Sequence, residues 1–193
     1  MKRLFVLPLL VAASFSLASC RSESPAIKVN DLETSIEAFD DEITQWWASD
    51  DFREVLLGGG LSFDADASQP GPAFIEVVAT RRISFLATGA ELDNRGVDVT
   101  ADDIAAMEEE FASDPTSQAI VDSLDADLRA QTLRDFARQE KLNELLQEPG
   151  AEPVAFDDFD VFLDPRYGTW DPDTGAVTSL SVGELRIRRP ASD

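Results

Sequence analysis

Apolar residues recur every three or four positions between residues 30 and 147, and this spacing predicts a block of amphipathic helices. In the first helix, over residues 30–49, the apolar positions fall on one face: Leu32, Ile36, Phe39, Ile43 and the pair Trp46 and Trp47. Asn30 followed by Glu33 is a variant of the capping box, so we expect this helix to begin at Asn30. Neighbouring helical residues point about 100° apart. One of the two tryptophans therefore extends the apolar face, and the other lies at its margin.

Glycines, prolines and capping residues mark the limits of the other helices. A loop rich in glycine and proline is expected over residues 58–72. Pro72 and Gly96 suit the start and the end of a largely apolar helix, which we expect to be the most buried one. Thr100 is placed to cap a helix whose outer face is acidic. The helices predicted after the first span residues 50–57, 72–95, 101–111, 115–124 and 126–147.

The period of the apolar pattern changes to two near both ends of the domain. Residues 26–29, 159–163 and 184–189 alternate as strands do, and 170–178 is predicted to be a turn between short strands. A lone strand leaves its backbone N–H and C=O groups unpaired, so the strand at 26–29 needs a partner, which we expect to be 159–163. The sequence therefore predicts an α+β fold, mainly helical, over residues 26–193. Pairing of the N-terminal strand with C-terminal strands closes its helical block.

Residues 1–19 have the composition of an export signal. Lys2 and Arg3 precede an apolar run that is too short to cross a hydrocarbon layer of ~30 Å, and no later stretch approaches the length of a membrane span. Cys20 is the only cysteine, and LASC, which ends at Cys20, resembles the bacterial lipobox, whose cysteine is acylated on sulfur. We expect residues 20–25 to form a tether and lipid on Cys20 to anchor the protein to the cell membrane outside the cytoplasm. The alternative is an ordinary secretory signal, with Cys20 removed or left free.

Charge and composition exclude several kinds of function. The formal net charge of −22 repels nucleic acid, so no nucleic-acid partner is expected. The chain has no histidine, which excludes Ser-His-Asp and Cys-His catalysis and removes the commonest metal ligand. The loop at 58–72 lacks the Gly-Lys-Ser/Thr of a phosphate-binding loop, and the stretch from Asp171 lacks most EF-hand ligands. Paired aspartates such as Asp102 and Asp103 are expected on solvated surface. We expect no catalytic residue, cofactor or metal.

Two groups of residues are candidates for a functional site. Exposed aromatic side chains bind apolar peptide, and the candidates for such a site are Phe39, Trp46, Trp47 and Phe74. The alternative for Trp46 and Trp47 is packing in the core. The second group lies in a loop punctuated by proline and glycine and consists of Pro165, Arg166, Tyr167, Gly168 and Trp170. We expect this loop to be a structural clasp on the helical block rather than an active site.

Four stretches, in order, resemble the SurA-like chaperone N-terminal domain family. IKVNDLETSIEAF is similar to its opening strand and helix, with Asp31 where the family pattern has glycine. ATRRISFLATGAELDNRGVDVTADDI and LRAQTLRDFARQEKLNELL are similar to the helices that follow. FLDPRYGTWD is similar to the closing signature of lipoprotein members, with Asp164 in place of asparagine.

This resemblance implies an extracytoplasmic holdase for unfolded or apolar polypeptide segments. Members of the family often carry a parvulin prolyl-isomerase domain, but this chain has neither room nor histidine for one. The predicted function is therefore chaperone-like binding of unfolded or exported polypeptides without catalysis. The alternative is an envelope lipoprotein that acts as an adaptor for one dedicated protein partner.

Overall fold

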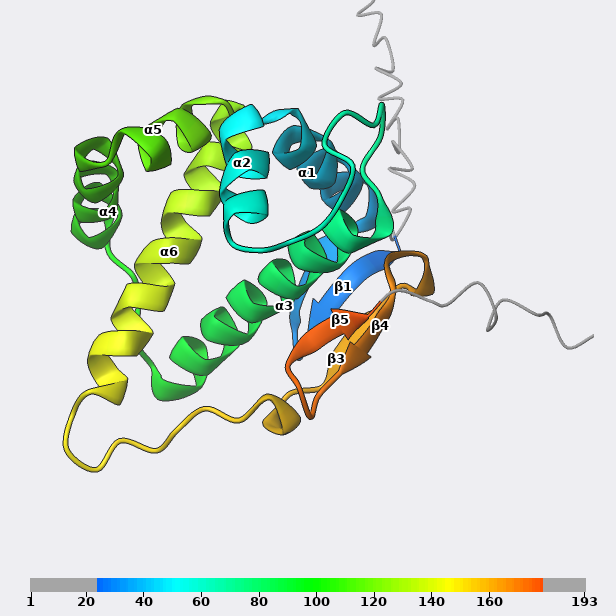
Figure 1. Ribbon diagram of the computed structural model, residues 1–193. Helices are drawn as coiled ribbons and strands as arrows, with labels where there is room; N and C mark the ends of the chain where they lie inside the picture. Colours follow the sequence, from blue (N-terminus) through cyan, green and yellow to red (C-terminus); the bar gives the residue numbers. More distant parts are fainter. Residues whose placement is uncertain (1–23, 179–193) are drawn as a thin grey trace, which may run out of the picture.

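The computed structural model describes residues 24–178, which form six α-helices and five β-strands (Figure 1). The helices are α1 (Ile36–Ala48), α2 (Asp50–Gly58), α3 (Pro72–Arg95), α4 (Ala101–Ser113), α5 (Pro115–Asp122) and α6 (Ala126–Leu146). The strands are β1 (Pro25–Val29), β2 (Leu32–Ser35), β3 (Val161–Leu163), β4 (Thr169–Asp171) and β5 (Ala176–Thr178). The mainly helical α+β fold predicted from the sequence is confirmed. Cys20 and the strand predicted at 184–189 lie outside the described residues.

The helices after α1 lie where the sequence predicts them, because their ends are set by local capping. The side chain of Ser49 accepts a hydrogen bond from the backbone of Phe52 at the start of α2. Thr100 and Asp103 form a reciprocal capping box at the start of α4. Gly96, with φ of 67°, ends α3 in the left-handed conformation that favours glycine.

The start predicted for the first helix, at Asn30, is wrong. Asn30 has φ of 52°, a left-handed conformation that asparagine tolerates, and with Asp31 it forms the turn of a hairpin between β1 and β2. Its side-chain Oδ1 accepts from the backbone N–H of Asp160 at 3.0 Å, so it does not cap a helix. The cap of α1 is Ser35, whose hydroxyl accepts from the N–H of Ala38 at 3.2 Å.

The two ends of the described chain meet in one antiparallel sheet. Its strand order is β2-β1-β3, and Ile27 pairs with Leu163 and Val29 with Val161. The N–H of Asp164 also donates to the C=O of Ala26 at 2.7 Å. This confirms the predicted pairing of the N-terminal strand with a C-terminal one. The strands β4 and β5 form a separate antiparallel hairpin, as the turn pattern predicts.

The helix α3 is the centre of the fold. It lies between the strands on one side and α6 on the other (Figure 1). The main core packs around it and includes Ile27, Phe39 and Phe74. A smaller apolar cluster between α4 and α6 contains Met107 and Leu133. Within the described residues, no helix has the length and apolar character needed to cross a membrane.

Candidate functional site

Four aromatic residues from four consecutive parts of the chain meet at one end of the molecule. We call Trp47, Phe52, Phe63 and Phe74 the aromatic cluster; they come from the end of α1, from α2, from the loop at 59–71 and from the start of α3. The ring of Phe74 lies 4.9 Å from that of Trp47, 5.6 Å from that of Phe63 and 6.0 Å from that of Phe52. All three pairs are edge-to-face, a favourable arrangement of aromatic rings.

The aromatic cluster has a buried side and a side that reaches the surface. Phe74 and Phe52 are buried, whereas Trp47 and Phe63 are only partly covered and pack against the core from outside. Arg53 lies over the Trp47 ring at 5.2 Å, donates a hydrogen bond to the Trp47 carbonyl and forms an ion pair with Asp50. The solvent-facing part of the cluster is therefore an apolar surface beside a fixed, already paired cation.

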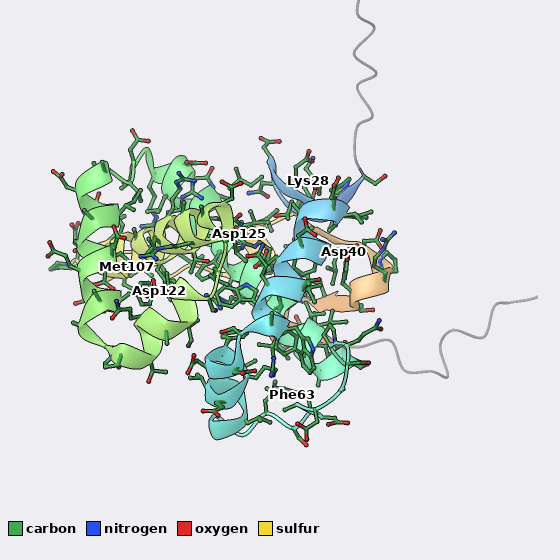
Figure 2. The ribbon with its side chains drawn as sticks, turned by 90° about the horizontal axis from the view of Figure 1, so that it is seen from above. Lys28, Asp40, Phe63, Met107, Asp122 and Asp125 are labelled. Carbon is green, nitrogen blue, oxygen red and sulfur yellow. The ribbon has the colours of Figure 1, made fainter. Side chains whose placement is uncertain are left out.

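The loop at 59–71 covers part of this cluster and is held mainly by one side chain. Its hydrogen bonds join residues within the loop or next to it, such as Leu61 N–H to Leu56 C=O at 3.0 Å and Ala67 N–H to Asp64 C=O at 3.3 Å. Phe63 is the aromatic residue by which the loop contacts Trp47 and Phe74. Figure 2 shows Phe63 at the α2 end of the molecule, far from Met107 and Asp122.

The structure places the four predicted peptide-binding residues in two different environments. Phe39, Trp46 and Phe74 are at most 1 % exposed and pack in the main core. A peptide has no access to these three side chains in this conformation. Trp47 is partly exposed at the margin, as the 100° angle between neighbouring helical residues predicts for one member of the pair. Phe63, which the sequence analysis did not select, packs on Trp47 and Phe74 from the loop at 59–71.

The predicted clasp contacts the helical block mainly through Tyr167. Its ring packs edge-to-face on that of Phe39 at 4.8 Å, and its hydroxyl donates to Asp40 Oδ1 at 2.8 Å. Burial, followed by the Asp40 carboxylate, raises the pKa of Tyr167 above its ordinary value of 10. Trp170, half-buried in β4, packs against the same core.

The other three residues of the loop shape its turn. Pro165 begins a single 3-10 turn, and Arg166 is exposed and pairs with Asp164 at 3.1 Å. Gly168 has φ of 130°, and a Cβ there would lie 2.6 Å from the carbonyl oxygen of Thr178, so this position requires glycine. These contacts are those of a packing element.

A buried charge network joins α1, α3 and α6, and sequence reasoning missed it. Arg82 donates from Nε and Nη2 to the two carboxylate oxygens of Glu42 at 2.8 and 2.7 Å, and from Nη1 to Asp135 at 2.7 Å. The three side chains are 2–4 % exposed. Trp46 Nε1 also donates to Glu42 at 3.3 Å. The available signal was Glu42 itself, a charged residue on the apolar face that carries Phe39, Ile43 and Trp46.

The charged groups of this network are hydrogen-bonded to one another, so few of their polar atoms remain free to take part in a reaction. Burial raises the pKa of Asp135, and the neighbouring Arg82 opposes that shift. Arg81 lies within 4.3 Å of the Trp46 ring and 5.2–5.4 Å of the rings of Phe85, Phe136 and Phe52. Burial lowers the pKa of Arg81 to about 10, still well above neutrality. Both arginines therefore stay charged and hold the three helices together.

A hollow of about 230 Å³ lies beside the network, between α1 and the start of α6. Gln45 and Asp125 line it and form two mutual hydrogen bonds of 2.7 and 3.0 Å, and Asp125 also caps α6. Asp41 and Asp127 complete an acidic rim. No group of three or more acidic or cysteine side chains is placed to hold a metal ion anywhere between residues 24 and 178. The hollow is therefore a weaker candidate than the aromatic cluster.

No family model, curated protein or solved structure matches this chain. The relationship to the SurA-like family stays a prediction from the sequence stretches that resemble it.

Proposed function

We propose that this protein is a lipid-anchored, extracytoplasmic, chaperone-like protein that binds unfolded or apolar polypeptide segments without catalysis. The observation that carries the proposal is the accessible side of the aromatic cluster, where Trp47 is partly exposed beside buried Phe74 and the loop residue Phe63 packs on both. Aromatic side chains bury a large apolar area at a low cost in conformational entropy, which suits a site that accepts many sequences.

Further apolar side chains on α2 support this assignment. Val55 and Leu57, at 48 % and 38 % exposed, lie on the helix that carries Phe52 and follows Trp47. Apolar groups of this size at a surface lose contact with water when an unfolded segment packs on them, which favours binding by about 25 cal/mol per Å². The net charge of −22 also keeps such a protein soluble while it carries an apolar client.

A specific observation supports the adaptor as the second candidate function. Phe162 is 46 % exposed on β3, which is an edge strand of the sheet. An edge strand with an exposed aromatic side chain can accept one partner strand by backbone pairing. This surface and the aromatic cluster come from different elements of the fold, so variants can test them separately.

The deciding experiment is an aggregation assay with two unrelated enzymes, each diluted from denaturant into the mature protein carrying Cys20→Ser. We expect light scattering to fall for both enzymes, and Trp47→Ala to reduce the effect severalfold while Phe162→Ala leaves it unchanged. Circular dichroism melts of both variants control for loss of fold. Suppression of neither enzyme would reject the chaperone-like function and favour the adaptor.

A further inference from the structure

One member of the aromatic cluster, Phe63, lies on a loop and packs on Trp47 and Phe74. Phe63 lies 5.8 Å from Trp47 and 5.6 Å from Phe74, ring centre to ring centre. It belongs to the stretch LSFDADAS, in which small and polar residues surround it. The chain thus shows which kind of group this surface accepts: an aromatic side chain carried on an irregular, largely polar segment.

The backbone hydrogen bonds of this loop are local. Gly59 and Gly60 join it to α2, Pro70 and Gly71 join it to α3, and its hydrogen bonds connect residues inside the loop or directly beside it. Loops with few contacts to the rest of the fold open at a low free-energy cost. Withdrawal of Phe63 would break no backbone pairing with a distant element and would uncover the faces of Trp47 and Phe74.

We propose that Phe63 is an internal occupant of this site and that an aromatic side chain of an extended client segment displaces it. The client segment is positively charged around that aromatic side chain, because the net charge of −22 and the exposed carboxylates of Asp51 and Glu54 on α2 attract cations. This inference rests on the proposed function and adds the chemistry of the client and the competition with the loop.

The competition makes a quantitative prediction. A site that is free for only a fraction of the time binds its ligand with an affinity reduced by that fraction. Phe63→Ser removes the competitor and leaves the site in place, so it should tighten binding of the blocked peptide Gly-Lys-Phe-Lys-Gly at least fivefold. Trp47→Ala should weaken binding at least tenfold, and Phe162→Ser, at an exposed aromatic residue outside the site, should change nothing. Replacing the peptide's phenylalanine by serine, or its lysines by glutamates, should abolish binding.

Amide hydrogen exchange of the unmodified protein tests the displacement without any variant. Saturating peptide should speed exchange at Leu61 and Ala67, whose N–H groups are bonded within and beside the loop. Equal or weaker binding by a folded Phe63→Ser variant, or unchanged exchange in the loop of the peptide-bound protein, would overturn the proposal. If the protein suppresses aggregation but Phe63→Ser does not tighten peptide binding, only the displacement fails. If the protein neither binds peptide nor suppresses aggregation, both the displacement and the proposed function are rejected.

Discussion

The hydroxyl of Tyr167 donates a hydrogen bond to the Asp40 carboxylate at 2.8 Å, across 127 residues of sequence. Tyr167 stands in the loop between β3 and β4, and Asp40 lies in the first half of α1. Figure 2 shows Asp40 beside the returning C-terminal segment. The bond therefore joins the last part of the described chain to the first helix, beside the point where β1 and β3 pair.

We predict that Tyr167→Phe lowers the free energy of unfolding by about 1 kcal/mol, the net worth of one such hydrogen bond. Asp40 stays hydrated in the variant, because its side chain is exposed, so no larger penalty is expected. Asp40→Ala should cost a similar amount, and the double variant should cost little more than either single one. Urea denaturation measures all three, and additive losses would show that the two groups do not interact.

Deleting every residue from Phe159 onward should destabilise the helices as well as remove the C-terminal strands. The deletion removes the partner of β1 and the Tyr167 ring that packs on Phe39. Buried backbone groups left unpaired cost about 1–3 kcal/mol each. We expect a large fall in melting temperature and faster proteolysis within α1 and α3. Equal melting temperatures for the truncated and complete mature chains would show that the two ends are energetically independent.

Sequence reasoning located most of the fold because most helix ends depend on short-range signals. Gly96, Thr100 and Pro115 act within a turn of the helix they begin or end. The start of α1 was placed wrongly because the conformation of Asn30 depends on Asp160, which is 130 residues away. No local pattern contains that contact.

The candidate site was located only in part, for similar reasons. Helical periodicity predicts that one tryptophan of the pair lies at the margin of the apolar face, and this one is Trp47. Phe63 belongs to a loop in which the apolar residues have no regular spacing. The only signal there was a lone aromatic residue among mostly small and polar ones. Arg82 contacts Glu42 and Asp135 from 40 and 53 residues away, and an apolar helix containing two adjacent arginines does not reveal their partners.

Removing the buried cation should be among the most destabilising single changes in this protein. Arg82→Leu leaves the Glu42 and Asp135 carboxylates without the guanidinium that pairs them, which costs about 3–5 kcal/mol for a buried ion pair. Arg134→Leu is the matched control, since Arg134 lies exposed on α6, and should change stability by less than ~0.5 kcal/mol. Urea denaturation measures both. A loss below ~1 kcal/mol for Arg82→Leu would mean that the network contributes little.

Cys20→Ser should abolish lipid attachment and leave the fold unchanged. The prediction follows from LASC and from the absence of a second cysteine in the sequence. Cells fed radiolabelled fatty acid should label the unmodified protein only, and the variant should leave the membrane fraction. The melting temperature of the purified variant serves as the control for folding. Equal labelling of both proteins would place the lipid elsewhere or reject the anchor.

Recognition of unfolded polypeptide can be tested by comparing two states of one client protein. The client is a disulfide-containing enzyme, labelled with a fluorophore and used either native or reduced and alkylated so that it stays unfolded. Fluorescence anisotropy during titration with the mature protein should show saturable binding of the unfolded form and at least tenfold weaker binding of the native form. Binding of neither form, or equal binding of both, would show that the protein does not recognise the unfolded state.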